Sequence, residues 1–193
     1  GHYYARNQFM ACMCRPGTKN NLNRGIYKSC NTYFSNVYRR IIDKDNKVEE
    51  NINNWHKHLN SFGLGNYLGY DHPVGQPGYV PNANFYNLWY PNQRWRGSTI
   101  VSNAIGQGEI LMTPIQLANV AATIANRGFF YTPHFVKDIQ GDFIDPKYKT
   151  KRATSISKEH FTNVIEGMAD VVSKGTARVA AIRGIEVCGK TGT

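Results

Sequence analysis

The chain ends in a short run of residues whose types could bind an anionic substrate. Lys190 and Thr191 place a cation beside a hydroxyl, and Gly192 would let another molecule approach the backbone closely. A lysine and a hydroxyl can hold a carboxylate together, and backbone N–H groups at the same place can stabilise a developing oxyanion. The residue types therefore predict a site for a carboxylate near the end of the chain.

The same segment also matches a nucleotide-binding pattern. Residues 184–191 read G-x-x-x-x-G-K-T, the phosphate-binding P-loop. That loop needs a buried strand before it and a helix after its lysine, because the helix N–H groups hold the phosphates. Residues 185–188 alternate like a strand themselves, and only Gly192 and Thr193 follow the motif. We therefore treat nucleotide binding as the weaker alternative.

A serine and an asparagine far upstream could complete the carboxylate site. Ser29-Cys30-Asn31 is an S-x-N motif, which serine acyltransferases acting on penicillin and D-alanyl peptides combine with K-T-G. The motif lies between two expected helices, so a turn there would project a hydroxyl and an amide outward. Ordinary helix capping would explain the same residue types.

The nucleophile motif of such enzymes, S-x-x-K, has one literal match at residues 155–158. We assign it no catalytic role, because Ser155 and Ser157 precede an amphipathic helix whose N-terminus they could cap. Lys158 falls in the first turn of that helix, off the apolar face set by Phe161. The match also follows S-x-N along the chain, which is the wrong order.

The four cysteines show no metal-binding spacing. They are Cys12, Cys14, Cys30 and Cys188, and the C-x-C of the first two lacks the spacing of a two-pair zinc site. We expect unpaired thiols or one incidental disulfide, and we expect no metal and no cofactor. A Cys30 nucleophile would need a histidine partner, and none can be assigned.

The elements that must position these residues are mostly helical. A chain of 193 residues predicts about one domain. Apolar periodicity and turn signals predict helices over residues 21–28, 34–41, 52–62, 113–127 and 157–174, and a strand over 185–188. Thr113 to Gln116 form a capping box, and the following helix has a face of alanines that would permit close packing. Residues 63–108 are rich in glycine, proline and aromatics, and we expect this segment either to be functional or to pack around its own aromatic rings.

Composition excludes some classes of protein. Hydrophobic residues make up 41% of the chain, which excludes a disordered tail, and no run of about 18 apolar residues could span a membrane. The net charge is +10, and residues 1–42 contain no acid. This asymmetry indicates an anionic partner or a plain basic surface. Since no nucleic-acid-binding motif is present, we do not expect a nucleic acid.

Longer blocks of the sequence resemble class B penicillin-binding proteins, with the elongation-type D,D-transpeptidases most similar. The most specific block is residues 98–119, which contains I-G-Q-G-E and T-P-I-Q. Further matches are residues 62–65, 167–177 and the closing G-K-T-G-T, and the similarity covers about residues 20–193. The resemblance implies an α+β fold of the β-lactamase/transpeptidase type, with an antiparallel sheet flanked by helices and incomplete here.

The resemblance also implies roles for individual residues. Ser29 would shuttle a proton to the leaving group, Asn31 would hydrogen-bond the peptide carbonyl of the substrate, and Lys190 would supply positive potential. The substrate-binding residues would be Thr191, Gly192 and Thr193. In this family the acylated serine precedes S-x-N, so we expect residues 1–193 to be part of one transpeptidase domain without its nucleophile segment and its C-terminal strands.

The implied function is cross-linking of D-Ala-D-Ala stem peptides in cell-wall synthesis, with penicillin binding. The expected partners are peptidoglycan stem peptides or their lipid-linked precursor, β-lactam antibiotics and membrane proteins of cell elongation. The expected location is the periplasmic face of the inner membrane. A penicillin-sensing or wall-binding module of the same fold is the alternative.

Overall fold

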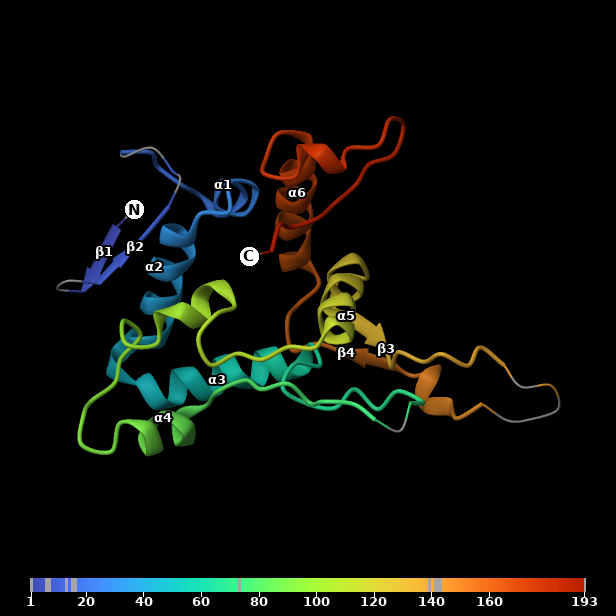
Figure 1. Ribbon diagram of the computed structural model, residues 1–193, viewed down its shortest axis with the longest axis horizontal. Helices are drawn as coiled ribbons and strands as arrows, with labels where there is room; N and C mark the ends of the chain where they lie inside the picture. The colour runs from blue at the N-terminus through green and yellow to red at the C-terminus, as the bar shows by residue number, and fades with distance from the viewer. Residues whose placement is uncertain are drawn as a thin grey trace.

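The protein is described by a computed structural model that covers residues 2–5, 8–12, 14, 17–72, 74–138, 140 and 144–192. Helices dominate this part of the chain (Figure 1). The α-helices are α1 (Leu22–Tyr27), α2 (Asn31–Ile42), α3 (Val48–Ser61), α4 (Ala83–Trp89), α5 (Pro114–Ala125) and α6 (Glu159–Ser173). The 3-10 helices are η1 (Lys44–Asn46), η2 (Val101–Ile105), η3 (Pro146–Tyr148) and η4 (Arg178–Ala180).

The strands form two small antiparallel ribbons. Strand β1 (His2–Ala5) pairs with β2 (Gln8–Met10), and β3 (Phe129–Tyr131) pairs with β4 (Lys151–Ala153). Together with the helices these ribbons agree with an incomplete α+β transpeptidase fold, as predicted. No helix in the described ranges is both long enough and apolar enough to cross a membrane.

The helices predicted from periodicity are present, and α2 buries only some of its apolar residues. Its buried residues are Ser35, Tyr38 and Ile42, whereas Val37 and Ile41 are exposed. Helix α2 contacts α3 and η2, and these neighbours cover the stripe through Tyr38. The apolar residues of α2 lie on two adjacent stripes, one with Val37 and Ile41 and one with Tyr38 and Ile42. The tertiary contacts determine that the second stripe is the buried one.

Helix α5 begins with the predicted capping box, in which the Thr113 hydroxyl accepts from Gln116 N and the Gln116 side chain accepts from Thr113 N. Its alanine face is exposed, so the prediction of close packing through alanines is not met within the described residues. The buried face is polar instead. The Gln116 amide donates to the carbonyl oxygens of Gly63, Asn66 and Pro77 at 2.8–3.1 Å. These bonds hold the glycine-rich segment against the helix.

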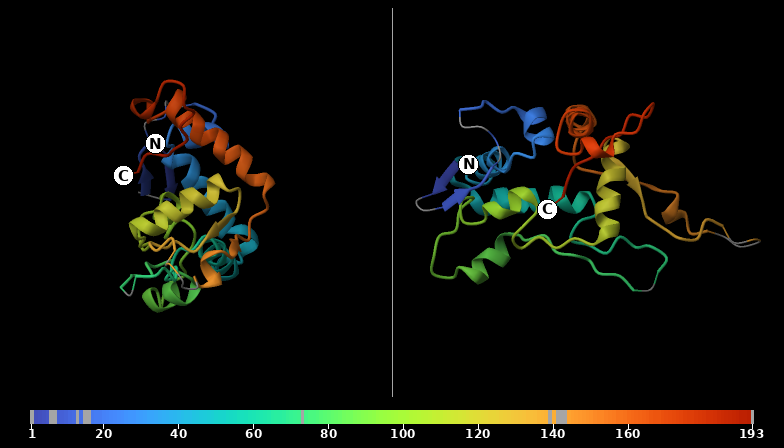
Figure 2. Two further views of the ribbon diagram at one scale, coloured as in Figure 1. Left: turned by 90° about the vertical axis from the view of Figure 1, so that its right-hand side faces the viewer. Right: turned by 45° about the horizontal axis from the view of Figure 1, so that its top comes forward.

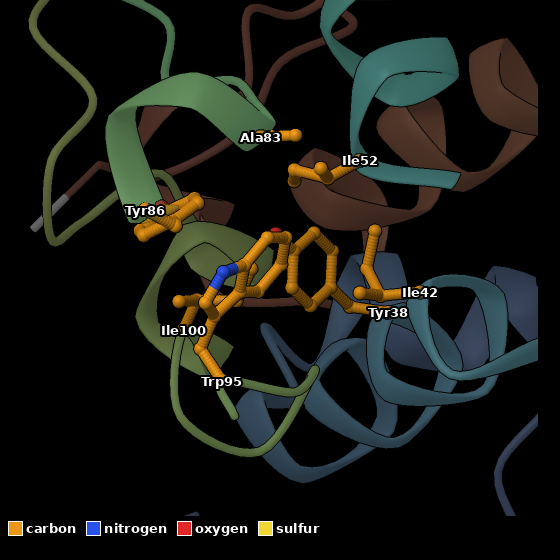
Figure 3. Packing of buried hydrophobic residues seen from close by; sticks show 7 residues of the cluster. All are labelled: Tyr38, Ile42, Ile52, Ala83, Tyr86, Trp95 and Ile100. Atoms are coloured by element: carbon orange, nitrogen blue, oxygen red, sulfur yellow. The ribbon is translucent and has the colours of Figure 1, made fainter. Parts of the chain in front are cut away.

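The glycine- and aromatic-rich segment packs around its own rings, which is one of the two predicted alternatives. It also contains α4 and η2, which the prediction missed. Its side chains join those of α2 and α3 in one hydrophobic cluster (Figure 3). The buried members are Tyr38, Ile42, Ile52, Ala83, Tyr86, Trp95 and Ile100. The Tyr86 and Trp95 ring centroids are 5.0 Å apart. This cluster forms the platform on which α2 is held.

The expected strand over residues 185–188 is not formed. Ile182 and Ile185 make an isolated bridge across a tight turn, and residues 186–192 have no regular secondary structure. A strand is stable when its backbone groups pair with a neighbour, and the described residues place no strand beside this segment. The segment runs back along α6, beside which α1 also lies (Figures 1 and 2).

Candidate functional site

Ser29 occupies a strained turn immediately after α1. The Ser29 N–H donates to the Ile26 carbonyl at 3.0 Å, and the Cys30 N–H donates to the Gly25 carbonyl at 2.9 Å. These two bonds form a Schellman motif, in which the position of Ser29 normally requires a left-handed residue such as glycine. Ser29 has φ of 51° and so takes this conformation with a side chain present. A non-glycine residue at positive φ is a strained arrangement of the kind that clusters at functional sites.

The turn is fixed on both sides by helices. Cys30 is fully buried and precedes the first residue of α2, Asn31. On the other side, α1 packs tightly on α6, where a Cβ on Gly167 would lie 2.7 Å from the Ile26 side chain. The amide of Asn23 in α1 also donates to the Asp170 carboxylate in α6 at 3.0 Å. The Ser29 hydroxyl therefore projects from a rigid helix–turn–helix unit.

Lys190 reaches this turn from the other end of the chain. Its Nζ donates to the Ser29 hydroxyl at 2.6 Å, although 161 positions separate the two residues. The same Nζ donates to the Thr191 carbonyl at 2.8 Å and contacts the Thr191 hydroxyl at 3.3 Å. The structure thus brings together the serine of S-x-N and the lysine and threonine of K-T-G.

The C-terminal segment is anchored to α6. The Gly189 N–H donates to the Met168 carbonyl at 3.1 Å, and the hydroxyls of Thr191 and Thr176 lie 3.1 Å apart. Solvent reaches much of the Lys190 side chain, but burial by surrounding protein atoms lowers the pKa of its amine below the ordinary value of 10.5. A lowered pKa makes the Lys190 ammonium a stronger acid, so it gives up a proton more readily than an ordinary lysine does.

Two further predicted site residues lie beside the Ser29–Lys190 contact in the sequence. Asn31 lies in the first turn of α2, two residues from Ser29, and Gly192 follows Thr191 with no atom near its Cβ position. Thr193, predicted to bind substrate, lies outside the described residues. A cavity of about 660 Å³ is lined mainly by the start of α3 and by the segment that follows α4, and none of these site residues lines it.

Neither the S-x-x-K match at residues 155–158 nor the P-loop match at residues 184–191 forms the site that its pattern suggests. The Ser155 hydroxyl is 2.7 Å from His58 Nδ1 and 3.0 Å from the Ser61 hydroxyl, so it joins the start of α6 to α3. It does not cap α6 as predicted, because the helix begins later, at Glu159. Residues 186–192 form neither the strand nor the helix of a P-loop.

Three cysteines come together beside the Ser29 turn, which the spacing did not predict. The Sγ atoms of Cys12, Cys14 and Cys30 all lie within 4.8 Å of one another. All four cysteines are free thiols, and Cys188 is exposed. The sequence did not predict this cluster, because Cys30 is remote from the C-x-C pair and lies within the S-x-N motif.

A serine hydroxyl bonded to the lysine of a K-T-G segment is the arrangement of serine acyltransferases that react with penicillin. The chain belongs to one family of this class, because residues 5–193 match the model of the penicillin-binding protein transpeptidase domain. This assignment confirms the resemblance seen in the sequence.

Individual relatives are named as peptidoglycan D,D-transpeptidases or as PBP2 proteins. Over 180 residues the chain is 30% identical to the peptidoglycan D,D-transpeptidase MrdA of Acinetobacter baumannii, covering 90% of this chain and 25% of the relative. The crystal structure of Pseudomonas aeruginosa PBP2 in complex with WCK 5153 has a TM-score of 0.73 and 29% identity, over 90% of this chain and 38% of that one. PBP2 from Helicobacter pylori, solved in complex with MreC, has a TM-score of 0.66 and 31% identity, over 90% of this chain and 30% of that one. The chain therefore spans about a quarter of the length of its curated relatives.

Proposed function

We propose that the chain is part of a peptidoglycan D,D-transpeptidase and forms two walls of its acyl-transfer site. The observation that carries this proposal is the hydrogen bond from Lys190 to Ser29, which joins two motifs at opposite ends of the sequence. The relatives named as peptidoglycan D,D-transpeptidases support it, and they favour a transpeptidase over a penicillin sensor or a nucleotide-binding protein.

The proposed reaction is serine acyl transfer. A serine that this chain does not supply attacks the D-Ala-D-Ala peptide carbonyl, and the terminal D-Ala leaves as an amine after receiving a proton through Ser29. An amine of a neighbouring stem peptide then attacks the acyl-enzyme and releases the serine. A β-lactam would acylate the same serine by opening its ring amide, and the amine released in that step would stay tethered to the acyl group and block the site.

The two walls of the site are the S-x-N segment and the K-T-G segment, and each has its own part in this scheme. Lys190 donates to Ser29 and polarises its hydroxyl for proton transfer. Asn31 hydrogen-bonds the substrate's peptide carbonyl, while Thr191, Gly192 and Thr193 hold the terminal carboxylate. Backbone N–H groups of the K-T-G segment stabilise the oxyanion of the tetrahedral intermediate.

The whole protein would act on stem peptides of peptidoglycan or of its lipid-linked precursor, at the periplasmic face of the inner membrane. It would work there with membrane proteins of cell elongation. The complex of Helicobacter pylori PBP2 with MreC supports an assembly of this kind.

Labelling with a fluorescent penicillin tests the proposal. The isolated chain should carry no label after denaturing electrophoresis, because the acylated serine is not among its residues. A longer protein that contains this chain together with an upstream S-x-x-K segment should be labelled. Covalent label on the isolated chain would refute the assignment of the nucleophile, and Ser155 would then need to be reconsidered.

A further inference from the structure

A hollow lined by α1, by the residues before it and by the end of α6 collects positive charge. It has a volume of about 400 Å³, and three of the side chains that line it are the cations Lys19, Arg24 and Lys174. The rest of its lining is Tyr27 and three asparagines, so among the described residues no acidic side chain lines it. This feature is named the basic hollow, and none of the residues placed in the acyl-transfer site lines it.

The three cations of the basic hollow are only partly neutralised. Lys174 Nζ pairs with the Asp170 carboxylate at 2.8 Å, and that carboxylate also accepts from the Asn23 amide at 3.0 Å. Lys19 and Arg24 have no acidic partner among the residues that the structure describes. The basic hollow therefore keeps two positive charges that no carboxylate of the described chain compensates.

The Tyr27 ring gathers cations around itself. Lys174 Nζ lies 5.2 Å from the ring centroid, Lys28 Nζ lies 5.4 Å from it, and the Arg24 guanidinium carbon lies 6.0 Å from it. Each cation is attracted to the ring, but like charges gathered around one ring repel one another. A bound anion would relieve this repulsion, and the ring keeps the cations in place to receive it.

Two buried polar atoms of the basic hollow lack partners. Arg24 Nη1 donates to the Tyr27 hydroxyl at 3.1 Å, but Arg24 Nε is buried without an acceptor in the described part of the chain. Asn20 Oδ1 is likewise buried, and no described residue donates to it. Buried polar atoms without a partner are unusual in folded proteins, and a ligand can supply the missing group. The basic hollow thus offers a donor to an anion and an acceptor to an N–H group.

We propose that the basic hollow binds a carboxylate of an acidic peptide. The carboxylate would lie against Lys19, Arg24 and Lys174, because a guanidinium presents a fork of N–H donors that matches two carboxylate oxygens. A neighbouring peptide N–H would donate to Asn20 Oδ1. A peptide supplies both groups together, whereas a phosphate or diphosphate supplies no N–H.

The basic hollow lies beside the turn of the acyl-transfer site in the sequence. Tyr27 is two residues before Ser29, and Lys174 follows the last residue of α6, which contacts α1. An acidic peptide could come from a stem peptide, which contains D-amino acids, or from an acidic segment of a protein, which contains L-amino acids. Only the first source rests on the proposed function. Failure of penicillin labelling would therefore leave the inference of carboxylate binding standing.

Isothermal titration calorimetry of the 193-residue chain at low ionic strength provides the test. The probes are tri-L-glutamate, tri-D-glutamate and inorganic pyrophosphate. We expect one glutamate peptide to bind per chain, more tightly than pyrophosphate does. Comparison of the two enantiomers distinguishes the two sources, and either preference supports the inference. NMR should also show that the bound peptide shifts the Arg24 side-chain N–H signals, and this readout requires no variant.

Single charge removals locate the binding site. Arg24→Gln should weaken binding of the glutamate peptide by at least about tenfold, because hydrogen bonds between charged groups are the strong ones. Lys19→Gln should weaken binding by about threefold or more, the scale of an exposed ion pair. Lys57→Gln in α3 is the matched control, since it removes one exposed charge outside the basic hollow and should change affinity by less than about twofold. Circular dichroism and thermal denaturation establish that each variant is folded.

Three results would overturn the inference. The first is the absence of binding of either glutamate peptide at millimolar concentration. The second is an equal loss of affinity in folded Lys19→Gln and Lys57→Gln, because the attraction would then come from net charge alone. The third is tighter binding of pyrophosphate than of both peptides, which would assign the basic hollow to a phosphate ligand.

Discussion

At the scale of single residues, Ser29 shows a conflict between stability and chemistry. Its position in the Schellman motif favours glycine, because a Cβ in the left-handed conformation is strained by roughly 1 kcal/mol. Ser29 nevertheless has φ of 51° and presents its hydroxyl to Lys190. The strained turn therefore holds the Ser29 hydroxyl beside the Lys190 amine.

Replacement of Ser29 by glycine should therefore stabilise the chain while removing the hydroxyl. We expect Ser29→Gly to raise the free energy of unfolding by about 0.5–1 kcal/mol relative to Ser29→Ala, which keeps the Cβ and its strain. Urea denaturation followed by tryptophan fluorescence measures the difference. An alanine variant as stable as the glycine variant would show that the turn is not strained in solution.

Lys190 should titrate below the ordinary lysine value. Its folded-state pKa is lowered by burial, so between that pKa and 10.5 the folded state binds fewer protons than the unfolded state. Over this window stability should rise with pH relative to the Lys190→Met variant, and at lower pH the full cost of the partly desolvated charge is present. NMR titration of the lysine Cε signals measures the pKa directly.

Lys174 provides the internal control for this titration. Its amine bonds to the Asp170 carboxylate at 2.8 Å, and that hydrogen bond raises its pKa. The two lysines should therefore shift in opposite directions. A Lys190 pKa at or above that of Lys174 would contradict the environment described for the site.

At the scale of elements, the contact of α1 with α6 sets the position of Ser29. Glycines on or after α6 allow this approach. A Cβ on Gly175 would meet the Tyr27 carbonyl oxygen and lie 2.7 Å from Val171 Cα. Both neighbours are backbone atoms that cannot rotate away, so the packing of the two helices depends on the missing side chain.

Gly175→Ala should consequently destabilise the chain by about 1–3 kcal/mol, the usual cost of overpacking. Gly189→Ala is the matched control, since nothing lies within 4 Å of its Cβ position, and it should change stability by less than about 0.5 kcal/mol. Chemical denaturation of both variants makes the comparison. Equal stability of the two would mean that α1 and α6 do not pack in this way.

Local signals predicted the elements better than the contacts between them. The capping box of Thr113 and Gln116 fixed the start of α5, but the three carbonyls bound by Gln116 come from distant loops and have no local signature. Helix α4 was missed because it is only seven residues long and lies in a segment dominated by turn formers. Strand 185–188 had the right alternation but lacks a pairing partner in the described chain.

The site followed the same rule. The S-x-N and K-T-G motifs predicted that Ser29 lies beside Lys190 and Thr191, and the hydrogen bond from Lys190 to Ser29 confirms this proximity. The cysteine cluster could not be predicted, because the approach of Cys12 to Cys30 depends on how the segment before α1 folds back. The periodicity of apolar residues does not predict how such a segment folds back on the rest of the chain.

At the scale of the whole molecule, the fold serves to bring the two ends of the sequence together. The hydrophobic cluster holds α2, the α1–α6 contact holds the turn, and the C-terminal segment returns along α6 to place Lys190 on Ser29. The central claim is our proposal that Ser29 and Lys190 both take part in acyl transfer.

The rate of acylation by a fluorescent penicillin tests that claim most directly, measured on the longer protein that contains this chain and an upstream S-x-x-K segment. Ser29→Ala and Lys190→Ala should each slow acylation by at least about 100-fold, the usual effect of losing a proton-transfer group. Ser155→Ala is the control and should react at the wild-type rate, because its hydroxyl bonds to His58 and Ser61 rather than to the site. Wild-type acylation by Ser29→Ala, or loss of acylation in Ser155→Ala, would contradict the account.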